Sequence, residues 1–261
     1  SVEHQHLPLA VRRLAGEVTA SALLAAAALE FDGTVLLQIA GDGPIKLLVA
    51  EVRPGLLFRV SVTMREDAGE ISADAGMTEL VNAGGRGRCA LILDQTGRDP
   101  DTQPYQGVVP LHGDHKEKLT RLSDVLQHYM LQSEQLDTTL VLAADEQVAA
   151  GLLIQRLPVQ GQDNLSQTSV AREDDAGEAA EDDYQRIAIL AKSLKREELL
   201  GLDADTILRR LFWEENLMRF EPQAGERGPR FACSCSRERV AAMLKGLGQE
   251  EAESILHEQG Q

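Results

Sequence analysis

Residues 29–49 read LEFDGTVLLQIAGDGPIKLLV and carry a strand-turn-strand pattern. Apolar residues alternate from Val35 to Ile39, then GDGP follows at 41–44, and alternation resumes from Ile45 to Val49. A period of two places every second side chain on one face of a strand, and two glycines around an aspartate suit a tight turn. A glycine-rich loop can also cradle phosphate, but the lysine and helix of a P-loop do not follow. The stretch therefore predicts a β-hairpin.

The segments on either side extend this hairpin into a domain of mixed structure. Val11, Leu14 and Val18 fall at helical spacing, and the predicted helix runs to about Leu29. Its alanine-rich part is about half as long as the ~20 residues that a membrane-spanning helix needs. We therefore predict a buried helix rather than a membrane span. An amphipathic helix is predicted at 116–131, and further strands at 56–62, 89–93, 107–111, 138–143 and 151–157. Strands joined mainly by hairpins, with two long helices, predict an α+β fold.

The chain changes character after this sheet-rich N-terminal domain, which we place at residues 1–160. Residues 161–183 end in seven acidic side chains within eleven positions, which favours a flexible, solvated segment. A helical linker is predicted at 184–228, where Asp203 is a candidate N-cap. Its apolar stripes need a partner surface, and we expect that surface on the sheet of the first domain; the stripe residues are Ile187, Leu190, Leu194, Leu208, Leu211 and Phe212. Residues 229–261 form a small C-terminal domain that contains two cysteines.

Composition excludes several classes of partner. The chain has 42 acidic and 26 basic side chains and a net charge of -16, which disfavours phosphate backbones and anionic membranes. Aromatic residues make up only 3% and leave few rings for stacking on bases. Three cysteines are too few, and odd in number, for a secreted disulfide scaffold, so we expect a reducing cytoplasm.

The two C-terminal cysteines are the residues most suited to chemistry. Cys233 and Cys235 stand two positions apart, so both thiolates can reach one zinc ion, although a structural site needs four ligands. Arg230, Arg237 and Arg239 flank them and favour the thiolate over the thiol. From spacing alone, two incidental small residues in a surface turn explain the pair equally well.

Other candidate groups have weaker patterns. Cys89 lies in a predicted strand and is expected to be a buried thiol, while His112 and His115 are expected in a loop. No dinucleotide, kinase or nucleophile-elbow motif occurs. A cysteine-dependent enzyme using Cys89 or Cys235 with a distant histidine remains the main alternative, and a zinc-ribbon nucleic-acid binder is a second.

Five stretches together resemble the heat-shock protein 33 family, the 33-kilodalton chaperonins. They are residues 29–49, YQGVVPLHGD at 105–114, YMLQSEQLDT at 129–138, EELLGLDADTILRRLFWEE at 197–215 and FACSCSRERV at 231–240. The resemblance implies a cytoplasmic stress protein that is not an enzyme: an ATP-independent holdase that binds unfolding client proteins and dimerises when active. It also implies that a CxC pair and a later CxxC hold zinc when reduced, and that oxidants form disulfides and release the linker.

The sequence departs from the family pattern in ways that bear on the zinc site. Cys233 and Cys235 match the CxC pair, but the later CxxC has no counterpart before Gln261, and Val240 replaces a cysteine that some relatives carry. The strand and helix that open the family's fold are also absent ahead of Ser1. We therefore expect either a fragment or a sequence that covers only the ordered part of a longer chain. The two ligands present are expected to bind zinc weakly or not at all.

Overall fold

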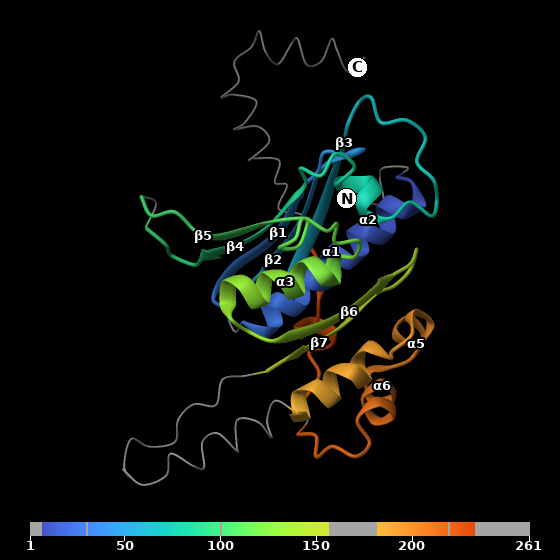
Figure 1. The fold of residues 1–261 in the computed structure, drawn as a ribbon. Coiled ribbons are helices and arrows are strands. Elements are labelled where there is room, and N and C mark those ends of the chain that lie inside the picture. The colour runs from blue at the N-terminus through green and yellow to red at the C-terminus, as the bar shows by residue number, and fades with distance from the viewer. Residues whose placement is uncertain (1–6, 30, 100, 157–181, 219, 233–261) are drawn as a thin grey trace. The chain divides into compact units, whose positions relative to one another are not determined.

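A computed structural model describes residues 7–29, 31–99, 101–156, 182–218 and 220–232 of the chain (Figure 1). The chain divides into two compact units, Ser1–Arg230 and Phe231–Gln261. Because the second unit is described only at its first two residues, the structural account concerns the first unit.

The first unit contains β5, β4, β1, β2 and β3 of a six-stranded sheet in the order β5-β4-β1-β2-β3-β8, and the edge strand β8 begins at Arg230, the unit's last residue. The strands are β1 (Gly33–Ala40), β2 (Ile45–Arg53), β3 (Leu57–Met64), β4 (Arg88–Gln95), β5 (Tyr105–Pro110) and β8 (Arg230–Phe231). The predicted hairpin is confirmed: β1 and β2 are antiparallel, and Val35, Leu37 and Ile39 are fully buried on one face of β1. At the edge of the sheet, the N–H of Arg230 donates to the carbonyl of Leu56 at 3.1 Å.

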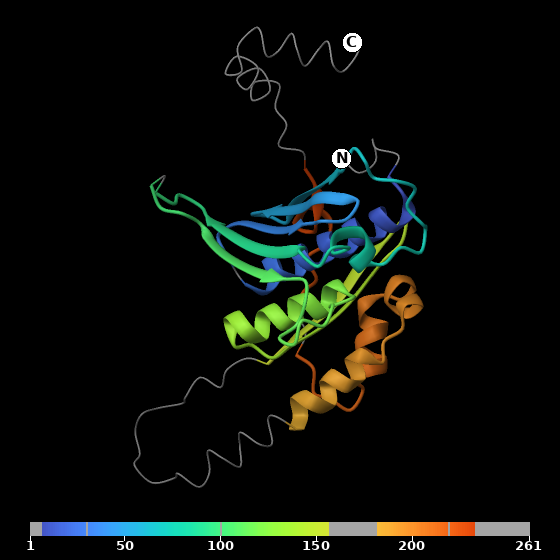
Figure 2. The same ribbon diagram turned by 45° about the horizontal axis from the view of Figure 1, so that its top comes forward.

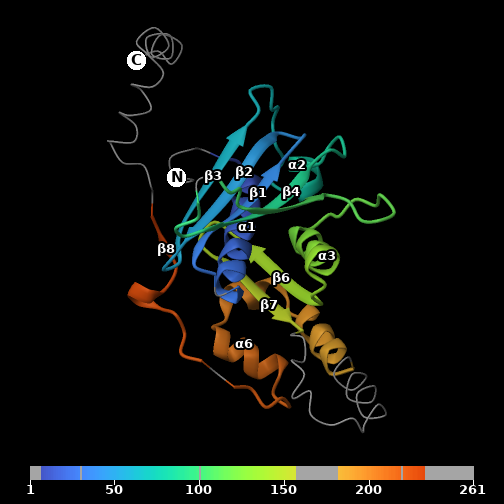
Figure 3. The same cartoon turned by 90° about the vertical axis from the view of Figure 1, so that its left-hand side faces the viewer.

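Helix α1 (Leu9–Ala28) lies between this sheet and a second, two-stranded sheet. The second sheet pairs β6 (Thr138–Ala144) with β7 (Ala149–Gln155) (Figure 3). A Cβ atom at Gly16 would lie 2.6 Å from the Cβ of Ala144, so this glycine lets α1 approach β6 closely. The predicted α+β class is confirmed. The alanine-rich stretch is a helix as predicted, but it is buried only at residues 20–22 and is exposed at 27–29.

Helix α3 (Leu122–Glu134) completes the main core, the buried cluster enclosed by the six-stranded sheet, α1 and α3. The sequence predicted this helix from residue 116, which is wrong by six residues. Lys116 has a left-handed φ of 62°, and His112 forms an isolated bridge with Lys118, so the chain still turns where the apolar spacing looked helical. Helix α2 (Met77–Val81) was not predicted, because five residues are too few to show periodicity.

Candidate functional site: the docked helical linker

The helical linker consists of three short helices. Residues 182–192 form the first, α5 (Arg196–Gly201) the second and α6 (Ala204–Leu211) the third. The predicted N-cap is confirmed, since Oδ1 of Asp203 accepts the N–H of Thr206 at 2.9 Å. Isolated helices shorter than about 12–15 residues are marginal in water. The order of the linker therefore depends on the surface against which it packs.

That surface is the β6–β7 hairpin. Leu194, Leu199 and Ile207 of the linker form one buried cluster with Ala143 of β6, separate from the main core. Partly buried apolar residues extend this cluster from both sides: Val141, Ala150 and Leu152 on the hairpin, and Leu200, Leu202 and Leu211 on the linker. Figures 1 and 2 show α5 and α6 beside the hairpin, whose other side faces α1. Burying one such aliphatic side chain contributes about 1.5–3 kcal/mol.

The hairpin is apolar on both faces because each face has its own partner. On β6, Leu142 packs on the main core, whereas its neighbours Val141 and Ala143 point to the linker. On β7, a Cβ at Gly151 would meet Leu24 of α1 at 2.7 Å, whereas Ala150 and Leu152 belong to the linker cluster. This alternation follows from the period of two. Without the linker, the outer face of the hairpin would be a strip of apolar side chains in water.

The six linker residues singled out in the sequence take different positions. Leu194 and Phe212 are buried, and Leu194 and Leu211 contact the cluster on the hairpin. Ile187, Leu190 and Leu208 are half-buried. The partner surface expected for these stripes was the sheet of the first domain; the structure places the contact on the two-stranded sheet rather than on the six-stranded one.

Polar contacts also join the linker to the rest of the unit. The hydroxyls of Tyr184 and Thr139 lie 3.1 Å apart, which ties the first linker helix to β6. Nη2 of Arg196, the first residue of α5, donates to the carbonyl of Ala144 at the end of β6. Within the linker itself, Arg210 pairs with Glu198 at 2.9 Å. The linker is thus held by apolar burial together with a few directional bonds.

Several large apolar side chains of the linker stay in contact with solvent. Ile189 is 67% exposed, Trp213 76%, Met218 83% and Phe220 82%. Exposed aromatic and aliphatic side chains are available for contact with other polypeptides. Ile189 was not singled out from the sequence, where it falls outside the amphipathic stripe.

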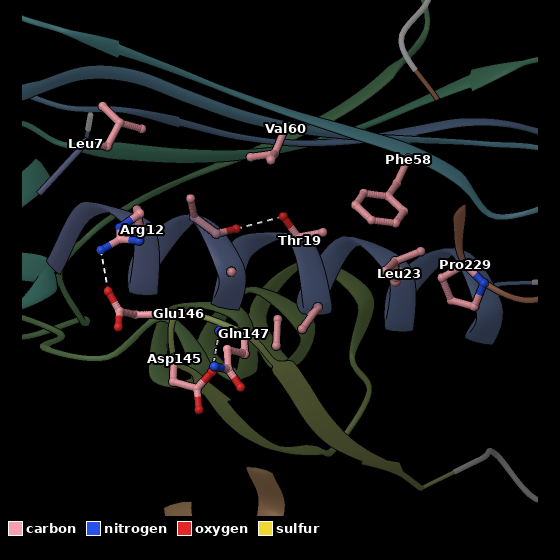
Figure 4. Close-up of a pocket in the computed structure, with 14 residues that line it drawn as sticks. Leu7, Arg12, Thr19, Leu23, Phe58, Val60, Asp145, Glu146, Gln147 and Pro229 are labelled. Carbon is pink, nitrogen blue, oxygen red and sulfur yellow. Dashed lines mark hydrogen bonds and ion pairs between the residues drawn. The ribbon is translucent and has the colours of Figure 1, made fainter. Parts of the chain in front are cut away.

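A groove of about 960 Å³ runs along α1 on the side that faces β3 (Figure 4). Leu23, Phe58 and Pro229 line one end, and an ion pair between Arg12 and Glu146 lies at the other. The hydroxyl of Thr19 is engaged with the carbonyl of Ala15 at 2.7 Å. The lining residues that the structure describes include no cysteine or histidine, so this described part of the groove offers contact surface.

Cys89 is a buried strand thiol, as predicted. It is 2% exposed within β4, and burial raises the pKa of its thiol to about 12. A nucleophilic cysteine needs an accessible thiolate at neutral pH, so the environment of Cys89 opposes the catalytic role left open by the sequence.

The other ligand candidates give no cluster in the described part of the chain. Cys233 and Cys235 lie outside the described residues, and no group of three metal-ligating side chains occurs among those that are described. His112 and His115 lie in a loop as predicted, where Nδ1 of His112 is 3.0 Å from the carbonyl of Gly113. No described helix is long and apolar enough to cross a membrane.

Sequence reasoning missed two residues of this site, Glu17 and Arg196. Both line a cavity of about 420 Å³ between α1, α3, β6 and the linker. Burial raises the pKa of Glu17 to about 7, and the charge of Arg196 opposes that rise. A signal for Glu17 was present, because a carboxylate next to Val18 interrupts the apolar face of a buried helix.

Comparisons with known proteins agree on one family. The family model described as Hsp33 protein matches residues 1–261. The 33 kDa chaperonin of Neisseria meningitidis serogroup A is 37% identical over 259 residues, which cover 99% of this chain and 74% of that protein. The 33 kDa chaperonin of Chromobacterium violaceum is 39% identical over 253 residues, covering 97% and 74%.

A solved structure supports the same fold. The 33 kDa chaperonin of Thermotoga maritima superposes with a TM-score of 0.62 and 19% identity, covering 94% of this chain and 76% of the other. The resemblance found in five stretches of sequence thus extends to the whole chain. With a family model that spans every residue and relatives of this identity and coverage, the chain belongs to the Hsp33 family.

Proposed function

We propose that this protein is an ATP-independent holdase chaperone of the cytoplasm, which binds unfolding proteins and prevents their aggregation. Membership of the Hsp33 family supports a chaperone role, and the relatives carry the name chaperonin. In this proposal the protein turns nothing over, and its partners are unfolded client proteins and, in the active state, a second copy of itself.

One structural observation carries the proposal: the linker covers an apolar face. Val141, Ala143, Ala150 and Leu152 of the hairpin are in contact with linker residues. When the linker leaves, this strip and the linker's own Leu194, Leu199 and Ile207 meet water together. Apolar surface attracts unfolded segments without sequence preference. The exposed Trp213 and Phe220 supply contact area even before release.

Oxidation of Cys233 and Cys235 is the proposed switch. Their thiolates are ligands of the type that zinc prefers, and they supply two of the four ligands of a structural site. Zinc, when bound, would stabilise the local fold around these cysteines and keep them as thiolates. Two ligands should deliver far less than the ~10–16 kcal/mol of a complete site. We therefore expect this 261-residue chain to hold less than one tightly bound zinc per molecule by elemental analysis.

The net charge of -16 fits a holdase that must stay soluble while loaded with apolar clients. The same charge disfavours the nucleic-acid and membrane partners that the proposal leaves out.

Light scattering of a thermolabile client tests the function. Protein treated with peroxide should suppress aggregation stoichiometrically, whereas protein kept in excess reductant should suppress it less. Cys235→Ser should remove the response to peroxide, and Cys89→Ser, at a buried thiol, is the matched control that should keep it. Equal failure of oxidised and reduced protein to suppress aggregation would overturn the proposal. Turnover of a substrate that depends on Cys235 would favour the cysteine-enzyme alternative.

A further inference from the structure

Arg196 of α5 is a cation that the linker places beside α1. It lines two cavities, of about 420 and 260 Å³, and in both of them Glu17 of α1 is also part of the wall. Its guanidinium donates to the carbonyl of Ala144. A residue of α5 therefore lies beside Glu17 of α1 and bonds to the end of β6, the strand on which the linker packs.

The other charged groups around these cavities are largely engaged elsewhere. Arg121 makes two bonds to Asp124, at 3.0 and 2.9 Å, from the start of α3. Arg13 of α1 contacts the carbonyl of Ala73 at 3.4 Å, and Asp74 lies in the same loop as Ala73. Asp145 in the β6–β7 turn accepts the amides of Val148 and Gln147; these bonds lower the pKa of its carboxyl, and the charges of Arg196 and Arg13 lower it further. Lys192 of the linker also lines the larger cavity.

Glu17 is half-buried where the linker closes over α1. Burial raises the pKa of its carboxyl from 4.5 to about 7, and among the causes of the shift Arg196 is the charge that opposes burial. When the linker leaves, Lys192, Leu194 and Arg196 no longer wall the larger cavity. Water then reaches Glu17, and because burial is the larger effect, its pKa falls toward 4.5.

We propose that Arg196 is the positioning residue that fixes the linker on the core, and that Glu17 makes this docking respond to pH. The docked state binds a proton at Glu17 that the released state gives up. Docking is therefore favoured at acidic pH: this contribution is full below about pH 4.5 and is lost progressively as the pH rises from there through about 7. Arg196 limits the loss by compensating the carboxylate once it ionises. The link from docking to chaperone activity rests on the proposed function; the docking itself does not.

Hydrogen exchange on the reduced full chain tests this proposal. The exchange rates of residues 187–211 are expressed as protection factors, because these correct for the change of the intrinsic exchange rate with pH. If the pKa of Glu17 is about 7 in the docked state and 4.5 in the released state, the protection of the linker should fall by up to about tenfold from pH 6 to pH 8. Glu17→Gln mimics the protonated carboxyl and should keep protection nearly constant over this range. Glu66→Gln, on an exposed loop, is the matched control and should behave as wild type.

Arg196→Gln is the second variant to measure. It distinguishes an electrostatic role of Arg196 toward Glu17 from a role in packing alone. It should lower linker protection more at pH 8, where Glu17 is ionised and has lost its cation, than at pH 6. Wild-type protection that is independent of pH, or an Arg196→Gln effect equal at both pH values, would overturn the proposal. Client aggregation is measured in parallel: protection that follows pH without any holdase activity would reject the proposed function while leaving the docking inference standing.

Discussion

Removing one buried leucine from the linker should release it without unfolding the main core. Leu199 of α5 is buried in the cluster on the hairpin, and that cluster is separate from the main core. Leu→Ala substitutions at buried sites cost about 2–5 kcal/mol. Since the linker forms the outermost layer, where relaxation is easy, we take the lower value of about 2 kcal/mol. At 1.4 kcal/mol per factor of ten, this raises the released population about 30-fold.

The assay is hydrogen exchange of reduced Leu199→Ala protein. Exchange of the linker amides between residues 187 and 211 should accelerate about 30-fold, while amides of β1 and β2 keep their wild-type protection. Ile189→Ala is the matched control, because Ile189 is 67% exposed in the first linker helix and should change stability by less than about 0.5 kcal/mol. Unchanged linker exchange in Leu199→Ala would refute the docking reasoning. An equal loss of protection in β1 and β2 would show that linker and core open as one unit.

Three further predictions follow from other parts of the structure. Cys89 should stay unmodified when the native protein is treated with iodoacetamide at pH 8 and analysed by mass spectrometry. A pKa of about 12 leaves a thiolate fraction on the order of 10⁻⁴ at that pH. Rapid labelling of Cys89 in the native protein would contradict its burial. Gly16→Val should lower the thermal midpoint by the equivalent of about 1–3 kcal/mol through its clash with Ala144, whereas Gly69→Val, where a Cβ meets nothing within 4 Å, should have little effect. Asp203→Ala should lower the stability of α6 by about 1 kcal/mol, because it removes the N-cap. Hydrogen exchange should then accelerate in α6 more than in β6, and equal acceleration in both would argue against the cap.

The elements that local pattern governs were predictable from the sequence. The β1–β2 hairpin follows from alternation and a glycine turn, and α1 from its apolar spacing. The start of α3 was not predictable, because Leu119 fits the helical spacing although the left-handed Lys116 precedes it in a turn. The cap at Asp203 was predictable, since its partner is three residues away.

The partner of the linker lay beyond such reasoning. Its apolar stripe shows that Leu194 and Leu211 need a surface, but nothing local selects β6–β7 over the larger sheet. A run such as LVLAA in β6 indicates burial on both faces, without naming the two partners. Glu17 and Arg196 are 179 positions apart along the chain, and their placement around shared cavities follows only from the packing of α1, β6 and α5.

The separation of the two apolar clusters explains how such a protein can expose surface and keep its fold. Helices of six and eight residues are too short to persist alone, so the linker is ordered only while the hairpin supports it. The hairpin itself is two-stranded and would be marginal in water, but α1 holds its inner face through the close approach at Gly16 and Gly151. Losing the linker therefore removes one layer and leaves the hairpin anchored. The free energy at stake is that of the outer cluster alone, a few side chains at about 1.5–3 kcal/mol each, opposed by the entropy of ordering the linker. A change of charge near the linker, or unfolding of a neighbouring segment, is large enough to shift the equilibrium between the docked and the released linker. The main core takes no part in this equilibrium.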